Sequence, residues 1–307
     1  MMKAERLAKV IAITIAWSSV VIAQDWPQWR GPNRDGAIAF FSEPASWPES
    51  LERRWRVEVG LGYATPILVD DRIYMFSRQG ENEVMQALDA DSGKAIWRTD
   101  YPATFEMIRQ TVRHGPGPKS TPAYADGRLF TLGMTGTVTA FDAQTGRQLW
   151  QKPGSPAQPM WHTAMSPIVD YDLVIVHVGG PGDTALTAFD VATGDVRWRW
   201  DGDAPAYGSP IIAEVGGTRD VVTFTQKHLV GVAAESGRLI WQRLFTTTSD
   251  TNVQTPILYR GSLIEAGREN GITAFRVSRR GATERLWHTD EVSMHMSNGV
   301  VINGVLT

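Results

Sequence analysis

The stretch FDAQTGRQLW, residues 141–150, occurs in nearly the same form at three other places in this chain. The other copies are LDADSGKAIW (88–97), FDVATGDVRW (189–198) and VAAESGRLIW (232–241). In every copy a glycine is followed four residues later by a tryptophan. A short phrase that returns at near-constant spacing indicates that the chain is built from copies of one structural unit.

Further landmarks extend the repeat. The glycines are Gly93, Gly146, Gly194 and Gly237, and the tryptophans that follow them are Trp97, Trp150, Trp198 and Trp241. A looser fifth copy holds Gly281 and Trp287, and LERRWRVEV (51–59) contributes Trp55 alone. A proline after a small hydroxyl residue opens each copy, at Thr65-Pro66, Thr121-Pro122, Ser166-Pro167, Ser209-Pro210 and Thr255-Pro256. Successive tryptophans are about 46 residues apart, which is the size of a four-stranded unit.

Each copy reads as four short antiparallel strands. After Pro122, two apolar runs flank Asp126-Gly127, a dipeptide typical of tight hairpins. TVTAF and RQLWQ follow as a third and a fourth strand, joined by a corner in which Asp142 can accept backbone N–H bonds and Gly146 can adopt positive φ. One such sheet cannot bury both faces, so the copies must stack, with the tryptophans packed between neighbouring sheets.

We therefore predict an all-β fold, a β-propeller of four-stranded antiparallel blades. About five blades are complete and others are partial, because LERRWRVEV lacks three preceding strands and SNGVVINGVLT (297–307) ends within a second strand. An edge left open is normally covered, so we expect the chain to be a fragment of an eight-bladed ring. The expected domains are a signal peptide (1–23), a leader segment (24–50) and an incomplete propeller (51–307).

The N-terminus indicates where the protein is located, and the net charge bears on which partners it binds. Lys3, Arg6 and Lys9 precede the apolar run Val10–Ile22, and the small residue Ala23 follows, as in a secretory signal peptide. The run is too short for a stable membrane span, although an uncleaved anchor is the alternative. We expect a periplasmic or extracellular protein. The net charge of −3 and the lack of a basic patch argue against nucleic acid as a partner.

The hydroxyl-proline opening, the Asp-Gly hairpin, the Asp-Ala-x-Thr-Gly corner and the closing tryptophan resemble the quinoprotein-like (PQQ-like) β-propeller repeat. DWPQWRGPNRDG (25–36) resembles the leader of exported bacterial members. The resemblance implies one of two functions: dehydrogenases that hold pyrroloquinoline quinone (PQQ) and Ca²⁺ on the ring axis, or a cofactor-free scaffold lipoprotein of outer-membrane barrel assembly. The chain has no cysteine, so it lacks both the adjacent cysteines of the alcohol dehydrogenases and the lipidated cysteine of the scaffold.

Candidate binding residues lie just before the first strand of several copies. They are Arg113, His114, Lys119, Trp161, His162, Tyr207, Asn252, Gln254 and His295. Cations, amides and aromatics at one position of many blades predict a polar face near the axis, the alternative being ordinary solvated loops. Most aspartates sit in hairpin corners, and Glu265, Asp201 and Asp203 remain as candidate Ca²⁺ ligands. His177 and His228 fall inside strands, where packing roles are expected.

These observations favour an exported, non-catalytic propeller that binds a protein or saccharide partner through its axial face and loop rim, with no cofactor, metal or catalytic residue assigned. The alternative is a PQQ- and Ca²⁺-dependent dehydrogenase of alcohols or sugars. The sequence leaves the partner, the blade number and the oligomeric state open.

Overall fold

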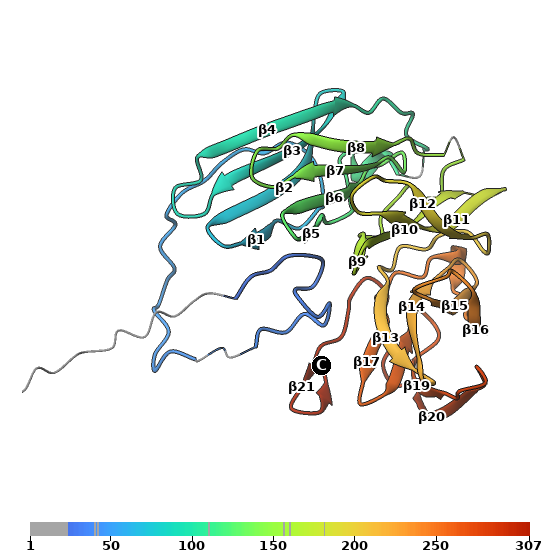
Figure 1. The fold of residues 1–307 in the computed structure, drawn as a ribbon. Coiled ribbons are helices and arrows are strands. Elements are labelled where there is room, and N and C mark those ends of the chain that lie inside the picture. The colour runs from blue at the N-terminus through green and yellow to red at the C-terminus, as the bar shows by residue number, and fades with distance from the viewer. Residues whose placement is uncertain are drawn as a thin grey trace, which may run out of the picture.

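The computed structural model describes residues 24–39, 41, 43–109, 111–155, 157–159, 161–180 and 182–307. Five four-stranded antiparallel sheets follow one another as blades of an arc (Figure 1). In each blade the strands keep their sequence order, with the first strand on the concave side of the arc and the fourth on the outside (Figure 1). The predicted propeller blades are therefore confirmed, and the predicted signal peptide lies outside the described residues.

The first three blades have the following bounds. Blade 1 consists of β1 (Ile67–Val69), β2 (Arg72–Gln79), β3 (Asn82–Asp89) and β4 (Ala95–Pro102). Blade 2 consists of β5 (Ala123–Ala125), β6 (Arg128–Leu132), β7 (Val138–Asp142) and β8 (Gln148–Lys152). Blade 3 consists of β9 (Ile168–Asp170), β10 (Leu173–Gly180), β11 (Asp183–Asp190) and β12 (Val196–Trp200).

Two further blades and a hairpin complete the described strands. Blade 4 consists of β13 (Ile211–Val215), β14 (Thr218–Phe224), β15 (His228–Ala233) and β16 (Leu239–Leu244). Blade 5 consists of β17 (Ile257–Tyr259), β18 (Ser262–Ala266), β19 (Ile272–Val277) and β20 (Thr283–Thr289). The hairpin of β21 (Val301–Ile302) and β22 (Val305–Leu306) begins a sixth copy. Two short 3-10 helices, η1 (Val112–His114) and η2 (Thr248–Asp250), lie in loops.

The hydrophobic core lies between blades rather than within them. One cluster joins Phe76 and Met85 of blade 1 to Leu129 and Phe141 of blade 2. Corresponding clusters join blades 2 and 3, blades 3 and 4, and blades 4 and 5. Each sheet is apolar on both faces and therefore needs a neighbour on each side, which is why the repeat stacks.

The recurring corner has the chemistry that its sequence predicts. Asp142 accepts hydrogen bonds from the backbone N–H of Thr145 (2.8 Å) and from its hydroxyl (2.7 Å), and Gly146 has φ of +75°. Hydrogen bonds to the charged form lower the pKa of Asp142, as they do for Asp89 and Asp190 at the equivalent corners. The pairing register shifts by one residue in each blade just before this corner, which is the expected β-bulge.

The repeated tryptophan and glycine form an outer seam between blades. The indole N–H of Trp198 donates to the carbonyl of Ala234 in the next blade (2.9 Å). A Cβ on Gly237 would lie 2.6 Å from the Trp198 ring, so only glycine lets the corner lie flat against the indole. The same pair of contacts recurs at Trp97 with Ala143 and Gly146, and at Trp150 with Val191 and Gly194.

An inner seam runs along the starts of the first strands. The backbone N–H of Thr65 donates to the Thr121 hydroxyl (3.1 Å), and the N–H of Thr121 donates to the Ser166 hydroxyl (3.0 Å). The N–H of Ser166 donates in turn to the Ser209 hydroxyl (3.0 Å). The small hydroxyl residues before the prolines of blades 2, 3 and 4 therefore each bond the preceding blade, which explains why this residue type recurs there.

The tryptophans at the two ends of the blade series differ in what covers them. Residues 51–59 form no strand, since no third strand lies beside them in the described part of the chain. Even so, the Trp55 indole donates to the Ala90 carbonyl (3.0 Å) and lies against Gly93, as the fourth strand of a preceding blade would. At the other end Trp287 has an exposed fraction of 45%, because no following corner covers it in the described residues.

Candidate functional site

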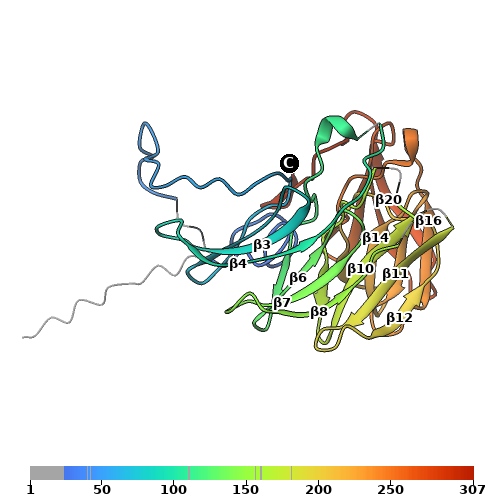
Figure 2. The same cartoon turned by 90° about the horizontal axis from the view of Figure 1, so that it is seen from above.

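The loops that lead into the first strands gather at one edge of the blades. We call them the lead-in loops: 103–122, 153–167, 201–210, 245–256 and 290–300. Figure 2 shows η1, in green, and η2, in orange, standing at this edge, with many of the hairpin turns at the opposite edge. All nine predicted binding residues lie in these loops, so the fold places them on one face, although at different depths.

Lys119, Trp161 and Tyr207 bring three lead-in loops together. The Lys119 Nζ and the Tyr207 hydroxyl both donate to the carbonyl of Trp161, each at 2.7 Å. The ammonium also lies 3.4 Å from the Tyr207 hydroxyl and 5.3 Å from the centre of that ring. Burial lowers the pKa of Lys119 to about 8 and raises that of Tyr207. The loops before blades 2, 3 and 4 thus share one polar junction.

His162 and Trp161 carry donors without partners at this junction. His162 is buried with φ of +61°, its ring packs edge-on against Phe105 (5.3 Å between centroids), and its Nε2 accepts the N–H of Ile108 (3.4 Å). Burial, and then the charge of Lys119, lower the pKa of His162, which makes the ring neutral at pH 7. A neutral ring that accepts at Nε2 has its proton on Nδ1. That Nδ1 and the Trp161 Nε1 are buried without a hydrogen-bond partner among the described residues.

Some of the other predicted residues are exposed at the rim, and others are buried with their side chains hydrogen-bonded within the fold. Arg113 and His114 belong to η1 at the rim, where Arg113 is exposed and its Nε lies 3.3 Å from the His114 Nε2. Gln254 is buried and donates to the Ser297 carbonyl (2.9 Å), and His295 is half-buried. Asn252 is 1% exposed and bonds three backbone carbonyls and the Thr247 hydroxyl, so its amide holds the loop and has no free donor.

The candidate carboxylate ligands do not fit a Ca²⁺ site. Glu265 is buried against Arg243 (2.6 Å), Asp203 accepts from Thr225 and the backbone of Lys227, and Asp201 pairs with Arg199. Within the described ranges, no three His, Cys, Asp or Glu side chains are grouped so that they could hold a metal ion. Ca²⁺ needs several converging oxygens, which these residues do not supply. His177 is buried beside Trp200, and burial lowers its pKa to about 4, as fits a packing role.

A hollow of about 640 Å³ adjoins the junction. Phe105, the ring that contacts His162, lines it together with Glu106, Ser155 and Gln158. Gln158 holds the hollow's wall by donating to the carbonyls of Thr135 (3.0 Å) and Ser155 (2.6 Å). This hollow gives the lead-in-loop face a concave region beside Phe105, whose ring contacts His162.

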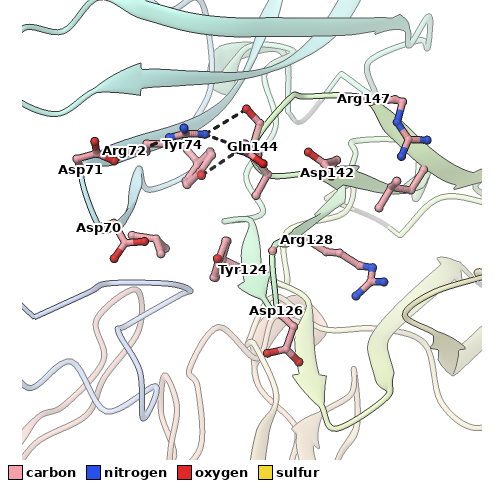
Figure 3. Close-up of a pocket in the computed structure, with 14 residues that line it drawn as sticks. Asp70, Asp71, Arg72, Tyr74, Tyr124, Asp126, Arg128, Asp142, Gln144 and Arg147 are labelled. Atoms are coloured by element: carbon pink, nitrogen blue, oxygen red, sulfur yellow. Dashed lines mark hydrogen bonds and ion pairs between the residues drawn. The ribbon is translucent and has the colours of Figure 1, made fainter.

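A second hollow of about 580 Å³ lies at a turn-lined seam between blades 1 and 2 (Figure 3). Arg72 and Tyr74 span the seam by donating to the carbonyls of Gln144 (3.1 Å) and Ala143 (3.2 Å). Asp126 and Asp142 lie at hairpin corners on its rim, as the sequence predicts. The sequence did not predict this hollow, since it forms only where two corners from different blades face each other.

The repeat region of this chain matches a known protein family. The family model described as outer membrane protein assembly factor BamB matches residues 48–198 and 80–307, in two overlapping matches. The chain belongs to this family of PQQ-like β-propellers. The resemblance stated from the repeat is thereby confirmed. Among the residues that the structure describes, no helix is long and apolar enough to cross a membrane.

Curated relatives of this PQQ-like propeller fall into two groups. The chain is 31% identical over 150 residues to the dehydrogenase subunit of the quinone alcohol dehydrogenase of Acetobacter aceti, covering 45% of this chain and 19% of that protein. It is 27% identical over 191 residues to BamB of Burkholderia pseudomallei, covering 62% of this chain and 46% of that protein. The chain thus spans between about a fifth and about half of these relatives.

Solved structures agree on the fold. Quinohemoprotein alcohol dehydrogenase from Comamonas testosteroni superposes with a TM-score of 0.61 at 18% identity, over 87% of this chain and 50% of that one. BamB from Moraxella catarrhalis superposes with a TM-score of 0.52 at 16% identity, over 76% of this chain and 62% of that one. At such identities the likeness shows the propeller architecture alone, because one fold hosts several functions.

Proposed function

We propose that this PQQ-like propeller is an exported, non-catalytic module that binds a protein or saccharide partner through its lead-in-loop face. The observation that carries the proposal is the junction at the Trp161 carbonyl, where loops from three blades meet. Beside it lie two buried donors without partners, on His162 and Trp161, and the exposed Arg113 at the rim. The exposed Arg113 guanidinium favours a partner that supplies oxygen acceptors such as carboxylates or carbonyls.

The relatives support both of the functions considered. A relationship to BamB favours the scaffold, and the signal-like N-terminus together with that relationship supports export. A relationship to quinone alcohol dehydrogenases favours the alternative of PQQ- and Ca²⁺-dependent oxidation of alcohols or sugars. The described carboxylates favour the scaffold, because Glu265 is paired with Arg243 and Asp203 accepts a hydrogen bond from Thr225.

The test compares two triple variants of the chain. In the first, Arg113→Ala, His114→Ala and Lys119→Ala remove three polar side chains of the lead-in-loop face. In the control, Asp71→Ala, Asp126→Ala and Arg147→Ala alter the second hollow. A glycan array and a panel of purified outer-membrane proteins serve as probes. We expect the first variant to lose at least tenfold in affinity for the probe that binds wild type and the control to keep it, with both proteins folded at the assay temperature.

Equal binding by the first variant and wild type would overturn the site assignment. The dehydrogenase alternative is tested separately, by adding PQQ and CaCl₂ and following dye reduction with ethanol, methanol and glucose. Turnover that depends on both additions would overturn the non-catalytic assignment. Absence of turnover together with probe binding supports the scaffold.

A further inference from the structure

The leader loop, residues 25–36, lies on the concave side of the arc, against the first strands of several blades (Figure 1). Trp26 forms an antiparallel bridge with Leu68 of β1, through its N–H to the Leu68 carbonyl (2.7 Å) and the reverse bond (3.1 Å). The next carbonyl, of Pro27, accepts the N–H of Tyr124 in β5 (2.8 Å). The leader loop thus adds backbone bonds to the free inner edges of blades 1 and 2.

The same loop reaches three more copies of the repeat. The Trp29 indole donates to the Thr255 hydroxyl at the start of blade 5 (2.9 Å), and Arg30 donates to the Gly299 carbonyl beside the last hairpin (2.6 Å). Arg34 donates to the carbonyls of Ser166 (3.1 Å) and Pro167 (2.8 Å) at the start of blade 3. A twelve-residue segment that touches the inner elements of five copies occupies the space on which they converge.

Arg34 is the buried charge of this arrangement. Its exposed fraction is 4%, its guanidinium also donates to the Gln28 side chain (3.0 Å), and its Nε has no hydrogen-bond partner in the described structure. Burial lowers the pKa of Arg34 to about 9, but the group stays a cation at neutral pH. Its partners are two backbone carbonyls and the Gln28 amide oxygen, the kinds of oxygen that Ca²⁺ takes as ligands.

We propose that the leader loop is a built-in plug of the propeller axis, with Arg34 as its fixed cation, and that it excludes PQQ and Ca²⁺ from the axis. In the family resemblance stated above, the dehydrogenases hold that cofactor and ion on the axis, and here the position is filled by the protein's own backbone, Trp29 and Arg34. A dication placed there would face the guanidinium charge in a buried setting, where like charges repel strongly. The loop also covers inner sheet edges.

An engineered disulfide tests whether the plug occupies its place in solution. The chain has no cysteine, so the pair Trp26→Cys with Leu68→Cys introduces the only two. The control pair joins Trp26→Cys to Tyr171→Cys, an exposed residue of blade 3. We expect mild oxidation to close the first pair nearly completely and the control pair by less than a tenth. Equal closure of both pairs would overturn the plug.

Cofactor exclusion is tested by calorimetry on wild type and on the closed disulfide variant, titrated with PQQ in excess CaCl₂. We expect no saturable binding to either protein. Binding of one PQQ per chain to the closed variant would overturn the exclusion, since the plug is then locked in place. If the cysteine pair does not fold, hydrogen exchange on wild type takes its place: we expect slow exchange of the Leu68 and Tyr124 amides, and fast exchange at both would overturn the plug. None of these variants touches the lead-in-loop face, so these outcomes are independent of the proposed function.

Discussion

The seam between blades 3 and 4 and the seam between blades 4 and 5 join the same kind of sheets in different ways. At the first, Trp198 bonds the Ala234 carbonyl of the next blade and lies against Gly237. At the second, the Trp241 indole donates to Asp220 of its own blade (3.0 Å), and a Cβ on Gly281 would meet the Ile240 carbonyl rather than a ring. The tryptophan position is thus repeated, but the contact that it makes is not.

The residue opposite the tryptophan explains the difference. Alanine faces the tryptophan in blades 1, 2, 3 and 5, whereas Gly231 faces Trp241. A Cβ on Gly231 would lie 2.0 Å from the Trp241 Nε1, so the missing methyl is what lets the indole lie back on its own sheet and reach Asp220. Trp241 still packs on Phe275 of blade 5, which keeps that seam apolar.

The inner seam changes at the same place. The Thr255 hydroxyl accepts from Trp29 of the leader loop instead of from the backbone of Ser209, whose N–H has no such bond in the described residues. Between blades 5 and 6 the inner bond returns, with Asn298 accepting the N–H of Thr255 (2.7 Å). The seam between blades 4 and 5 therefore lacks both regular bonds, and the lesson is that a repeat in sequence specifies packing more firmly than it specifies individual hydrogen bonds.

The largest expected effect is that of removing a regular seam tryptophan. Trp198→Ala deletes a ring that is 7% exposed together with its interblade hydrogen bond, and we expect it to lower the free energy of unfolding by about 3–5 kcal/mol. Trp287→Ala removes the half-exposed tryptophan of the last blade and is expected to cost about 1 kcal/mol or less. Urea denaturation measures both. Equal losses of unfolding free energy would contradict the stabilising role of the seam between blades 3 and 4.

A smaller effect is expected at the glycine that lies against Trp198. Gly237→Ala and Gly261→Ala both place an alanine at a φ just above +70°, but only the first puts a Cβ against a ring, at 2.6 Å, while the second meets nothing within 4 Å. We expect Gly237→Ala to cost about 1–3 kcal/mol more than Gly261→Ala, the usual range for overpacking. Thermal melting followed by circular dichroism measures the pair. Matching losses would mean that backbone strain alone accounts for the repeated glycine.

The smallest effect concerns the irregular seam and depends on pH. Burial raises the pKa of Asp220 above its value in the unfolded chain, so the carboxyl weakens the fold as pH rises from about 4 through the raised pKa and has a constant effect above it. Asp220→Asn keeps an oxygen acceptor for Trp241 and removes the ionisation. We expect the Tm of the variant minus that of wild type to increase with pH over this window and then level off. A difference that stays flat or falls would contradict a raised pKa for Asp220.

The location of the candidate site residues on one face was predictable from the sequence. Which of them are already hydrogen-bonded within the fold was not. The position before each hydroxyl-proline pair located Lys119, Trp161 and Tyr207 on one face, because equivalent positions of stacked copies lie at one edge. Nothing in the sequence indicated that the Asn252 amide nitrogen would bond backbone carbonyls of the fold, whereas the His162 Nδ1 would have no hydrogen-bond partner among the described residues. That division depends on how the loops of neighbouring blades pack, and those loops share no repeat pattern.

By itself the sequence determined the strands, the corners and the stacking of blades, because each rests on local chemistry: alternating apolar residues, an aspartate and glycine at the turn, and a tryptophan that needs a neighbouring sheet. Only the tertiary structure decided which acceptor each indole found, which hydroxyl reached which blade, and that the leader loop fills the concave side. Those outcomes depend on contacts between residues far apart in the chain, where one missing methyl at Gly231 is enough to redirect a side chain.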